Sequence, residues 1–257
     1  MGRQALLRLT HEPLYLENTA NRRIVVFIHG FMGTPRQFDE MAKIVHSQGY
    51  SAASLLLPGH GSTVKDFSSG TMNNWQEHVD AEIERFSRSN DSIYLVGHSM
   101  GCLLAINAAV KHSKNISGIF LIACPFKLRL ISIHSAKIKL KLVFCRRSHP
   151  MKSVYLAASS VPLRPSLAWR AIGPYIELKK LARIAKASLG NIRAPINAVY
   201  STADDVVSVR SLKILKAGIS QAPFECLILS ESLHAYFPEH EQRIIEASLK
   251  AALVTVP

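Results

Sequence analysis

A single serine stands between glycines two positions away on either side in Leu-Val-Gly-His-Ser-Met-Gly, residues 95–101. A serine hydroxyl is a weak nucleophile at neutral pH, so it needs a base within hydrogen-bond reach and an acid that orients this base. An apolar run precedes Ser99 and a helix-forming run follows it, which is the context of a sharp strand-to-helix turn. Gly97 and Gly101 leave the space that such a strained turn needs. The pattern predicts a nucleophile at Ser99.

Strands and helices are expected to alternate along most of the chain and so to position this serine. Continuous apolar runs, typical of strands buried on both faces, predict strands at 24–28, 50–57, 92–97, 116–125, 196–201 and 224–230. Helical spacing of apolar residues predicts helices at 35–48, 73–89, 100–111, 207–217 and 239–253. Thr34 is expected to cap the first helix, with Pro35 in its first turn. The alternation predicts an α/β fold whose mostly parallel sheet has helices on both faces.

Five stretches carry a resemblance to the α/β-hydrolase family, in this order: FIHGFMGTP (27–35), LLLPGHG (55–61), LVGHSMG (95–101), STADDVV (201–207) and SLHAYFPEH (232–240). Within that family the chain is most similar to small bacterial carboxylesterases and monoacylglycerol lipases. The resemblance covers nearly the whole chain outside residues 125–190. It implies an α/β-hydrolase fold and the family's order of nucleophile, acid and histidine along the chain.

The resemblance places the acid after the next-to-last predicted strand and the base after the last one. STADDVV offers two aspartates, and counting from Ser201, which stands where the family pattern has glycine, favours Asp204. Asp205 is the alternative acid, or else it caps the helix that follows. His234 takes the place of the base by its position. Ser99 would then attack an acyl group, while His234 moves the proton and Asp204 holds the imidazole.

A serine that transfers acyl groups also needs hydrogen-bond donors for the negative oxygen of its tetrahedral intermediate. One donor is expected to be the main-chain N–H after the nucleophile, at Met100. By resemblance, the second is the N–H of Phe31, in the loop after the first predicted strand, which His29 and Gly30 help to shape. His60 also matches the family, and we interpret it as a structural histidine of its loop.

The net charge of +13 lies entirely within residues 127–186, which hold 14 Lys and Arg and one acid. This segment interrupts the alternation between two strands, at the carboxyl ends where ligands bind in open α/β sheets. In the family that the chain resembles, an insertion at this place is a cap over the active site. The resemblance therefore implies an α/β-hydrolase core, 1–124 and 191–257, and a basic cap (lid), 125–190. The stretch KIKLKLVF (137–144) within this cap fits either an exposed strand or a helix.

The charge of the cap has two interpretations. It is a solvated surface, or it attracts anionic lipid surfaces or anionic substrates. Nucleic acid is not expected as a partner, because the segment has no recognition motif and few aromatic residues. The expected partner is therefore a small ester or lipid substrate, with peripheral contact to an anionic membrane as an option.

Composition and cysteine spacing bear on the class of protein, its localisation and its use of metals or disulfides. The chain has 257 residues, 48% of them hydrophobic and 19% charged, which is a globular composition. It has no apolar run of signal-peptide or membrane-spanning length, so a cytoplasmic protein is expected. Four scattered cysteines without C-x-x-C spacing predict neither a zinc site nor a disulfide framework. No motif calls for a cofactor or another metal.

These observations predict a serine hydrolase that cleaves carboxylic esters, either short-to-medium acyl esters or monoacylglycerols, through an acyl-enzyme. Thioesters and lysophospholipids are alternatives with the same chemistry. Other α/β-hydrolase reactions, such as C–C bond hydrolysis or cofactor-free haloperoxidation, form a second class. A non-catalytic binding protein of the same fold forms a third. Epoxide hydrolases and dehalogenases are disfavoured, because the predicted turn carries serine where those families carry aspartate.

Overall fold

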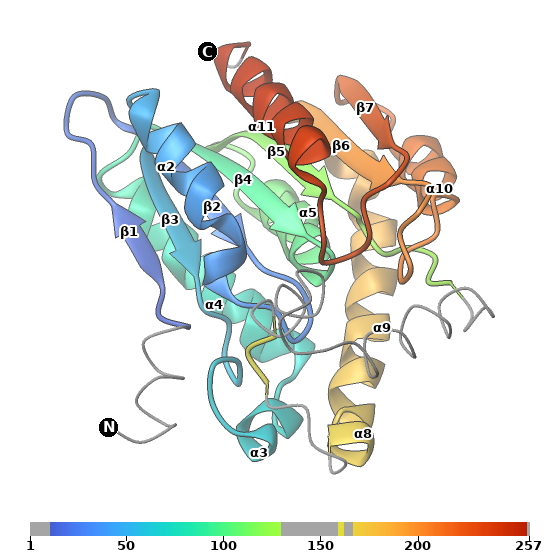
Figure 1. Ribbon diagram of the computed structural model, residues 1–257. Coiled ribbons are helices and arrows are strands. Elements are labelled where there is room, and N and C mark those ends of the chain that lie inside the picture. The colour runs from blue at the N-terminus through green and yellow to red at the C-terminus, as the bar shows by residue number, and fades with distance from the viewer. Residues whose placement is uncertain (1–10, 130–158, 162–166, 256–257) are drawn as a thin grey trace.

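A seven-stranded sheet forms the centre of the molecule (Figure 1). The computed structural model describes residues 11–129, 159–161 and 167–255. From edge to edge the strands are β1 (Leu14–Leu16), β3 (Ser51–Leu55), β2 (Arg23–Ile28), β4 (Ser92–His98), β5 (Ile116–Ile122), β6 (Ile196–Ser201) and β7 (Phe224–Leu229). Among these described strands all neighbours are parallel except β1 and β3. The predicted sheet is confirmed, and β1 is an addition whose three residues gave no sequence signal.

Helices cover both faces of the sheet, as the alternation predicted (Figure 1). One face carries α4 (Met72–Ser87), α5 (Met100–Lys111), α9 (Ile172–Ser188) and α10 (Ser211–Gly218), which share an apolar cluster with the strands. The other face carries α2 (Asp39–Ser47) and α11 (Glu239–Val254) in a second cluster. The shorter elements are η1 (Pro35–Phe38), α3 (Val64–Ser68), α8 (Leu167–Arg170) and η2 (Leu189–Asn191). The sheet that ends at the serine turn is therefore packed on both faces.

Two helix starts differ from the sequence prediction. After β2 the chain forms the 3-10 turn η1 before α2, and Thr34 makes no side-chain cap bond there. The Thr34 hydroxyl instead lies 3.0 Å from Nδ1 of buried His11. The helix predicted from 207 begins at Ser211, because Val207 forms an extended β-bridge with Leu128. In both places the residue predicted to start the helix instead contacts a segment distant in the sequence, so the helix begins later.

The predicted cap range, 125–190, is described in part and contains α8 and α9. Helix α9 packs on α5 and α4 and buries Leu178, Leu181 and Ala185 in the first apolar cluster. This end of the range therefore contributes to the layer that covers the sheet. The stretch 137–144, with its choice between strand and helix, lies outside the described residues, and the cap boundaries stay a prediction. No helix within the described ranges is both long and apolar enough to cross a membrane.

Candidate active site

Ser99 lies at a strained turn between β4 and α5. Its backbone has φ 53° and ψ −118°, a left-handed conformation that costs a non-glycine residue about 1–3 kcal/mol. The glycines beside it are required by close packing. A Cβ on Gly97 would lie 2.6 Å from the main-chain nitrogen of Cys102, and one on Gly101 would lie 2.0 Å from the carbonyl oxygen of Ile28. The predicted spacing of glycines thus follows from how closely α5 approaches the strands.

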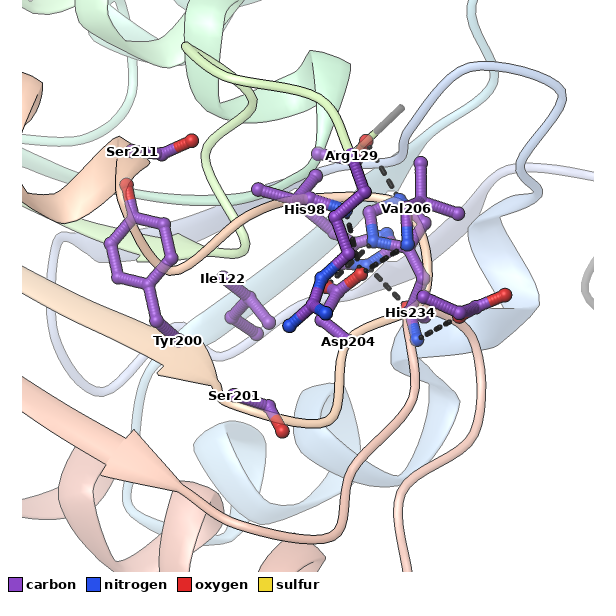
Figure 2. A network of polar contacts seen from close by, with 12 residues as sticks. His98, Ile122, Arg129, Tyr200, Ser201, Asp204, Val206, Ser211 and His234 are labelled. Atoms are coloured by element: carbon purple, nitrogen blue, oxygen red, sulfur yellow. Dashed lines mark hydrogen bonds and ion pairs between the residues drawn. The ribbon is translucent and has the colours of Figure 1, made fainter. Parts of the chain in front are cut away.

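The structure brings Ser99, His234 and Asp204 into one hydrogen-bonded row. His234 Nε2 lies 3.0 Å from Ser99 Oγ, and His234 Nδ1 lies 3.0 Å from Asp204 Oδ2. The second carboxylate oxygen of Asp204 accepts from the N–H groups of Val206 at 2.8 Å and Val207 at 2.7 Å (Figure 2). The three side chains come from the segments that follow β4, β6 and β7, and they meet because parallel strands bring their carboxyl ends to one edge of the sheet.

The ionisation of this row suits a general base. Burial alone would lower the pKa of His234, but the Asp204 carboxylate outweighs it and raises that pKa above its ordinary value. Burial alone would raise the pKa of Asp204, but His234 and the hydrogen bonds it accepts keep that pKa below its ordinary value. With Asp204 ionised, Nδ1 of neutral His234 holds the hydrogen and Nε2 presents a lone pair to the Ser99 hydroxyl.

Asp205 does not cap a helix, which corrects one of the two roles considered for it. Its Oδ1 accepts from the main-chain N–H of His234 at 3.0 Å, and α10 begins only at Ser211. The two neighbouring aspartates therefore hold the same histidine in different ways. Asp204 contacts the imidazole, and Asp205 contacts the backbone.

The loop of residues 29–33 runs beside Ser99. A Cβ on Gly30 would lie 3.0 Å from Ser99 Cβ, so a larger residue would have to push Ser99 aside by a few tenths of an ångström. Phe31 follows directly, and the loop closes with a bond from the Gly33 N–H to the Gly30 carbonyl at 2.8 Å. Met100 is the first residue of α5, where main-chain N–H groups have no acceptor within the helix. Both residues expected to supply N–H donors thus lie on segments that border the serine.

Two buried histidines fix this loop. His29 Nε2 accepts from the Leu57 N–H at 3.1 Å, and His60 Nε2 accepts from the Met32 N–H at 3.2 Å. Their rings meet edge to face, with centroids 4.7 Å apart. Burial lowers the pKa of both, that of His60 to about 4, so both are neutral acceptors near pH 7. The structural role expected for His60 matches these contacts.

Two residues of the site gave no clear sequence signal. His98 Nε2 donates to the main-chain carbonyl of His234 at 2.9 Å, although His98 was visible only as part of the serine motif. Glu241 is buried in α11, and its carboxylate accepts from the N–H groups of Ser230, Glu231 and Ser232 at 2.8, 3.1 and 2.7 Å. Both stabilise the loop that carries His234. Such contacts between segments leave no periodic pattern in a sequence.

In the part of the chain that the structure describes, no group of three or more His, Cys, Asp or Glu residues is arranged to bind a metal ion. A cavity of about 400 Å³ lies behind His98, between α2 and α11. Phe38, Ile122, Phe237 and Ile245 are among its apolar lining. Ser99, Asp204 and His234 do not line it, so it is separate from the reacting atoms.

Comparison with known proteins identifies relatives of the chain. A family model described as serine aminopeptidase, S33, matches residues 19–241. The thermostable monoacylglycerol lipase of Bacillus sp. (strain H-257) is 27% identical over 241 residues, which are 93% of each chain. The phospholipase YtpA of Bacillus subtilis is 34% identical over 103 residues, which are 38% of this chain and 39% of that one.

Solved structures show the same similarity. A structure of the metagenome-derived lipolytic enzymes LipS and LipT superimposes with a TM-score of 0.74 at 25% identity, over 95% of this chain and 97% of that one. The monoacylglycerol lipase of Paleococcus ferrophilus superimposes with a TM-score of 0.69 at 16% identity, over 95% and 98% of the two chains. The second likeness concerns the fold alone.

Proposed function

We propose an ester-cleaving function from the premise that this chain belongs to the serine aminopeptidase S33 family, as the match over residues 19–241 shows. It is a serine α/β-hydrolase of the lipase and esterase type. We infer that its substrates are short-to-medium acyl esters, monoacylglycerols among them. The relative that matches 93% of the chain is named a monoacylglycerol lipase, which supports an acyl ester rather than a peptide amide.

The observation that carries this proposal is the row of two 3.0 Å contacts from Ser99 through His234 to Asp204. In the proposed reaction Ser99 Oγ attacks the ester carbonyl carbon while His234 Nε2 takes the hydroxyl proton. The tetrahedral intermediate then collapses, and the imidazolium gives this proton to the leaving alcohol. Water repeats the sequence on the acyl-enzyme, which releases the carboxylic acid and restores the serine hydroxyl. Asp204 stays ionised and stabilises the imidazolium.

The N–H groups of Phe31 and Met100 are the proposed donors to the oxyanion. Two observations support this. Gly30, the residue before Phe31, packs against Ser99, and Met100 is the first residue of α5, whose N-terminus favours negative charge. Loss of one such donor costs about 2.7–4 kcal/mol of transition-state stabilisation. In this scheme His29 and His60 act indirectly, because they hold the loop that presents Phe31.

A panel of p-nitrophenyl esters of graded acyl length, with aminoacyl p-nitroanilides as the amide control, tests the function. We expect ester turnover, little turnover of the anilides, and labelling by a fluorophosphonate probe. Ser99→Ala should abolish both labelling and turnover, since loss of a catalytic nucleophile costs more than ~10³-fold in kcat. Preference for the anilides would overturn the substrate class, and higher residual turnover in Ser99→Ala would overturn the nucleophile.

We further propose that the basic cap brings the enzyme to anionic lipid surfaces, where acyl esters accumulate. Trp169, Ile172 and Ile176 follow one another at helical spacing in the described part of the cap, and their exposed fractions are 78%, 50% and 50%. Trp169 lies on α8, whereas Ile172 and Ile176 lie on α9 together with exposed Lys179 and Arg183. Exposed apolar side chains beside cations are the composition of helices that lie at a membrane interface.

A further inference from the structure

We propose that His98 is a positioning residue for His234, which it holds in place by its main-chain carbonyl. This inference rests on the proposed role of His234 as the base. His98 Nε2 lies 2.9 Å from the carbonyl oxygen of His234, and the two rings lie 4.9 Å apart at an interplanar angle of 38°. A carbonyl oxygen only accepts, so Nε2 of His98 carries the hydrogen in this bond.

The bond completes a set of contacts around His234. The Asp205 carboxylate accepts from the main-chain N–H of His234 at 3.0 Å, and His98 donates to the main-chain carbonyl of His234. The Asp204 carboxylate accepts from Nδ1 of the His234 ring at 3.0 Å. His234 lies on a loop between β7 and α11, where no strand or helix fixes the backbone. A base displaced by about 1 Å can lose two orders of magnitude in rate. Fixing both ends of this residue therefore keeps Nε2 near the serine hydroxyl.

The environment of His98 keeps its ring neutral. The ring is buried, and its Nδ1 is a buried atom without a hydrogen-bond partner among the described residues. Burial chiefly, and the neighbouring His234, lower the pKa of His98 to about 3. His98 thus remains neutral while His234 accepts a proton during the reaction. Two imidazolium rings 4.9 Å apart would repel each other, and this arrangement avoids that repulsion.

His98 also couples the base to the nucleophile, because it is the residue directly before Ser99. A Cβ on Gly30 would lie 3.3 Å from His98 Nδ1 and 3.0 Å from Ser99 Cβ, so the loop of residues 29–33 borders both. His98 also lines the cavity of about 400 Å³. Packing thus leaves room beside the ring, and the hydrogen bond to His234 supplies the orientation.

The variants His98→Gln and His98→Leu separate this bond from packing. Glutamine keeps an N–H donor at the end of its side chain, whereas leucine fills space without one. We expect His98→Leu to lower kcat about ten- to hundredfold with KM nearly unchanged, as misplacement of a catalytic group does. His98→Gln should recover most of that loss. Equal kcat in the two variants, or a wild-type kcat in His98→Leu, would overturn the proposal.

A second measurement does not depend on turnover. In a Ser99→Ala background, proton NMR follows the hydrogen between His234 Nδ1 and Asp204, which should be sharp in the parent and with His98→Gln. With His98→Leu we expect it to broaden or to exchange faster with solvent. An unchanged signal in His98→Leu would overturn the positioning role. If the signal broadens in His98→Leu but the wild-type protein cleaves no ester, the proposed function is wrong. The positioning role of His98 is then still supported.

Discussion

At the scale of single residues, the carboxylate of Asp204 fixes the orientation of the His234 ring toward Ser99. Its Oδ1 is occupied by the N–H groups of Val206 and Val207, so the carboxylate cannot rotate and Oδ2 faces His234. Asp205, one residue later, has its Oδ1 on the His234 backbone. Two chemically identical side chains thus differ in function because their partners differ.

Asp204→Asn should therefore be far more damaging than Asp205→Asn. At position 204 the amide oxygen keeps the bonds to Val206 and Val207, which turns its NH₂ group toward His234 and forces the wrong tautomer. Comparable changes lower kcat by about 10⁴-fold. Asparagine at 205 still offers an oxygen to the His234 N–H, so its kcat should stay within about tenfold, the value of one neutral hydrogen bond. Steady-state kcat on a short p-nitrophenyl ester measures both, and the reverse ranking would make Asp205 the acid.

The pH profile should show an acid limb that belongs to His234. Its pKa is raised, and only the neutral imidazole can take the serine proton, so kcat/KM should increase with pH through a midpoint above 6.5. His60 and His98, with pKa values of about 4 and 3, do not titrate in this range. A kcat/KM profile from pH 5 to 9 provides the midpoint. A midpoint well below 6.5 would contradict the influence of Asp204.

At the scale of elements, the site consists of strand ends joined to helices by short, fixed segments. The serine motif could be predicted because it follows a strand whose apolar run is visible in the sequence. The aspartate pair and His234 could be predicted because the resemblance to the α/β-hydrolase family places an acid and a histidine after the last two strands. His98 and Glu241 could not, because their partners lie in other loops, and neither spacing nor polarity encodes such a contact. The start of α10 was misplaced for the same reason, since Leu128 holds Val207 extended.

Gly101→Ala tests how tightly α5 is joined to the sheet. The added Cβ would lie 2.0 Å from the carbonyl oxygen of Ile28, and a strand backbone buried on both sides cannot move away. We expect a loss of about 3 kcal/mol in the free energy of unfolding, the upper end of the overpacking range. Gly173→Ala in α9 is the matched control, with nothing within 4 Å, and should be neutral or stabilising by up to about 1 kcal/mol. Urea denaturation compares the two, and similar values for both would contradict the predicted clash.

Glu241→Gln tests how α11 holds the loop of His234. Burial alone would raise the pKa of Glu241, but its hydrogen bonds to Ser232 and the neighbouring N–H groups lower it. Since the folded-state pKa lies below the ordinary value of 4.5, the ionised form stabilises the fold above 4.5 and this stabilisation is lost as pH falls through the folded value. Glu241→Gln should thus cost about 2 kcal/mol at pH 7, as for a bond to a charged group, and less in acid.

Thermal unfolding of Glu241→Gln at pH 7 and pH 4 measures this difference. Glu239→Gln is the control, because Glu239 lies on the same helix with a side chain 81% exposed and pairs with Arg243. It should change stability little at either pH. A Glu241→Gln protein as stable as this control at pH 7 would show that the buried carboxylate does not hold the loop.

At the scale of the whole molecule, charge is divided very unevenly. Residues 127–186 carry all of the net charge of +13, and the rest of the chain sums to zero. The described portion of this segment includes the exposed apolar and basic side chains of α8 and α9. A field of one sign attracts anionic partners over a Debye length of about 8 Å at physiological ionic strength.

Wild-type protein should sediment with anionic vesicles at low salt and detach as salt is added, because the attraction is screened. The triple change of Trp169→Ala, Lys179→Gln and Arg183→Gln should weaken this binding while turnover of a small soluble ester stays near wild type. The control Lys43→Gln with Lys250→Gln removes two exposed cations from α2 and α11, on the other face of the sheet, and should bind as wild type does. No sedimentation with anionic vesicles at low salt would leave the basic segment as a solvated surface, and equal sedimentation with neutral vesicles would show that its charge does not attract the membrane.

The anchoring of the His234 loop by Glu241 has a consequence for how the enzyme is made. A ribosome delivers Ser99 early, but Asp204, His234 and Glu241 emerge later, and α11 must then dock on the α2 face, where the Tyr50 hydroxyl donates to the Leu253 carbonyl at 2.9 Å. Under the proposed mechanism, a nascent chain that already displays Ser99 therefore lacks its base until the segment through α11 has been synthesised and has docked. Ester hydrolysis should begin only after that step.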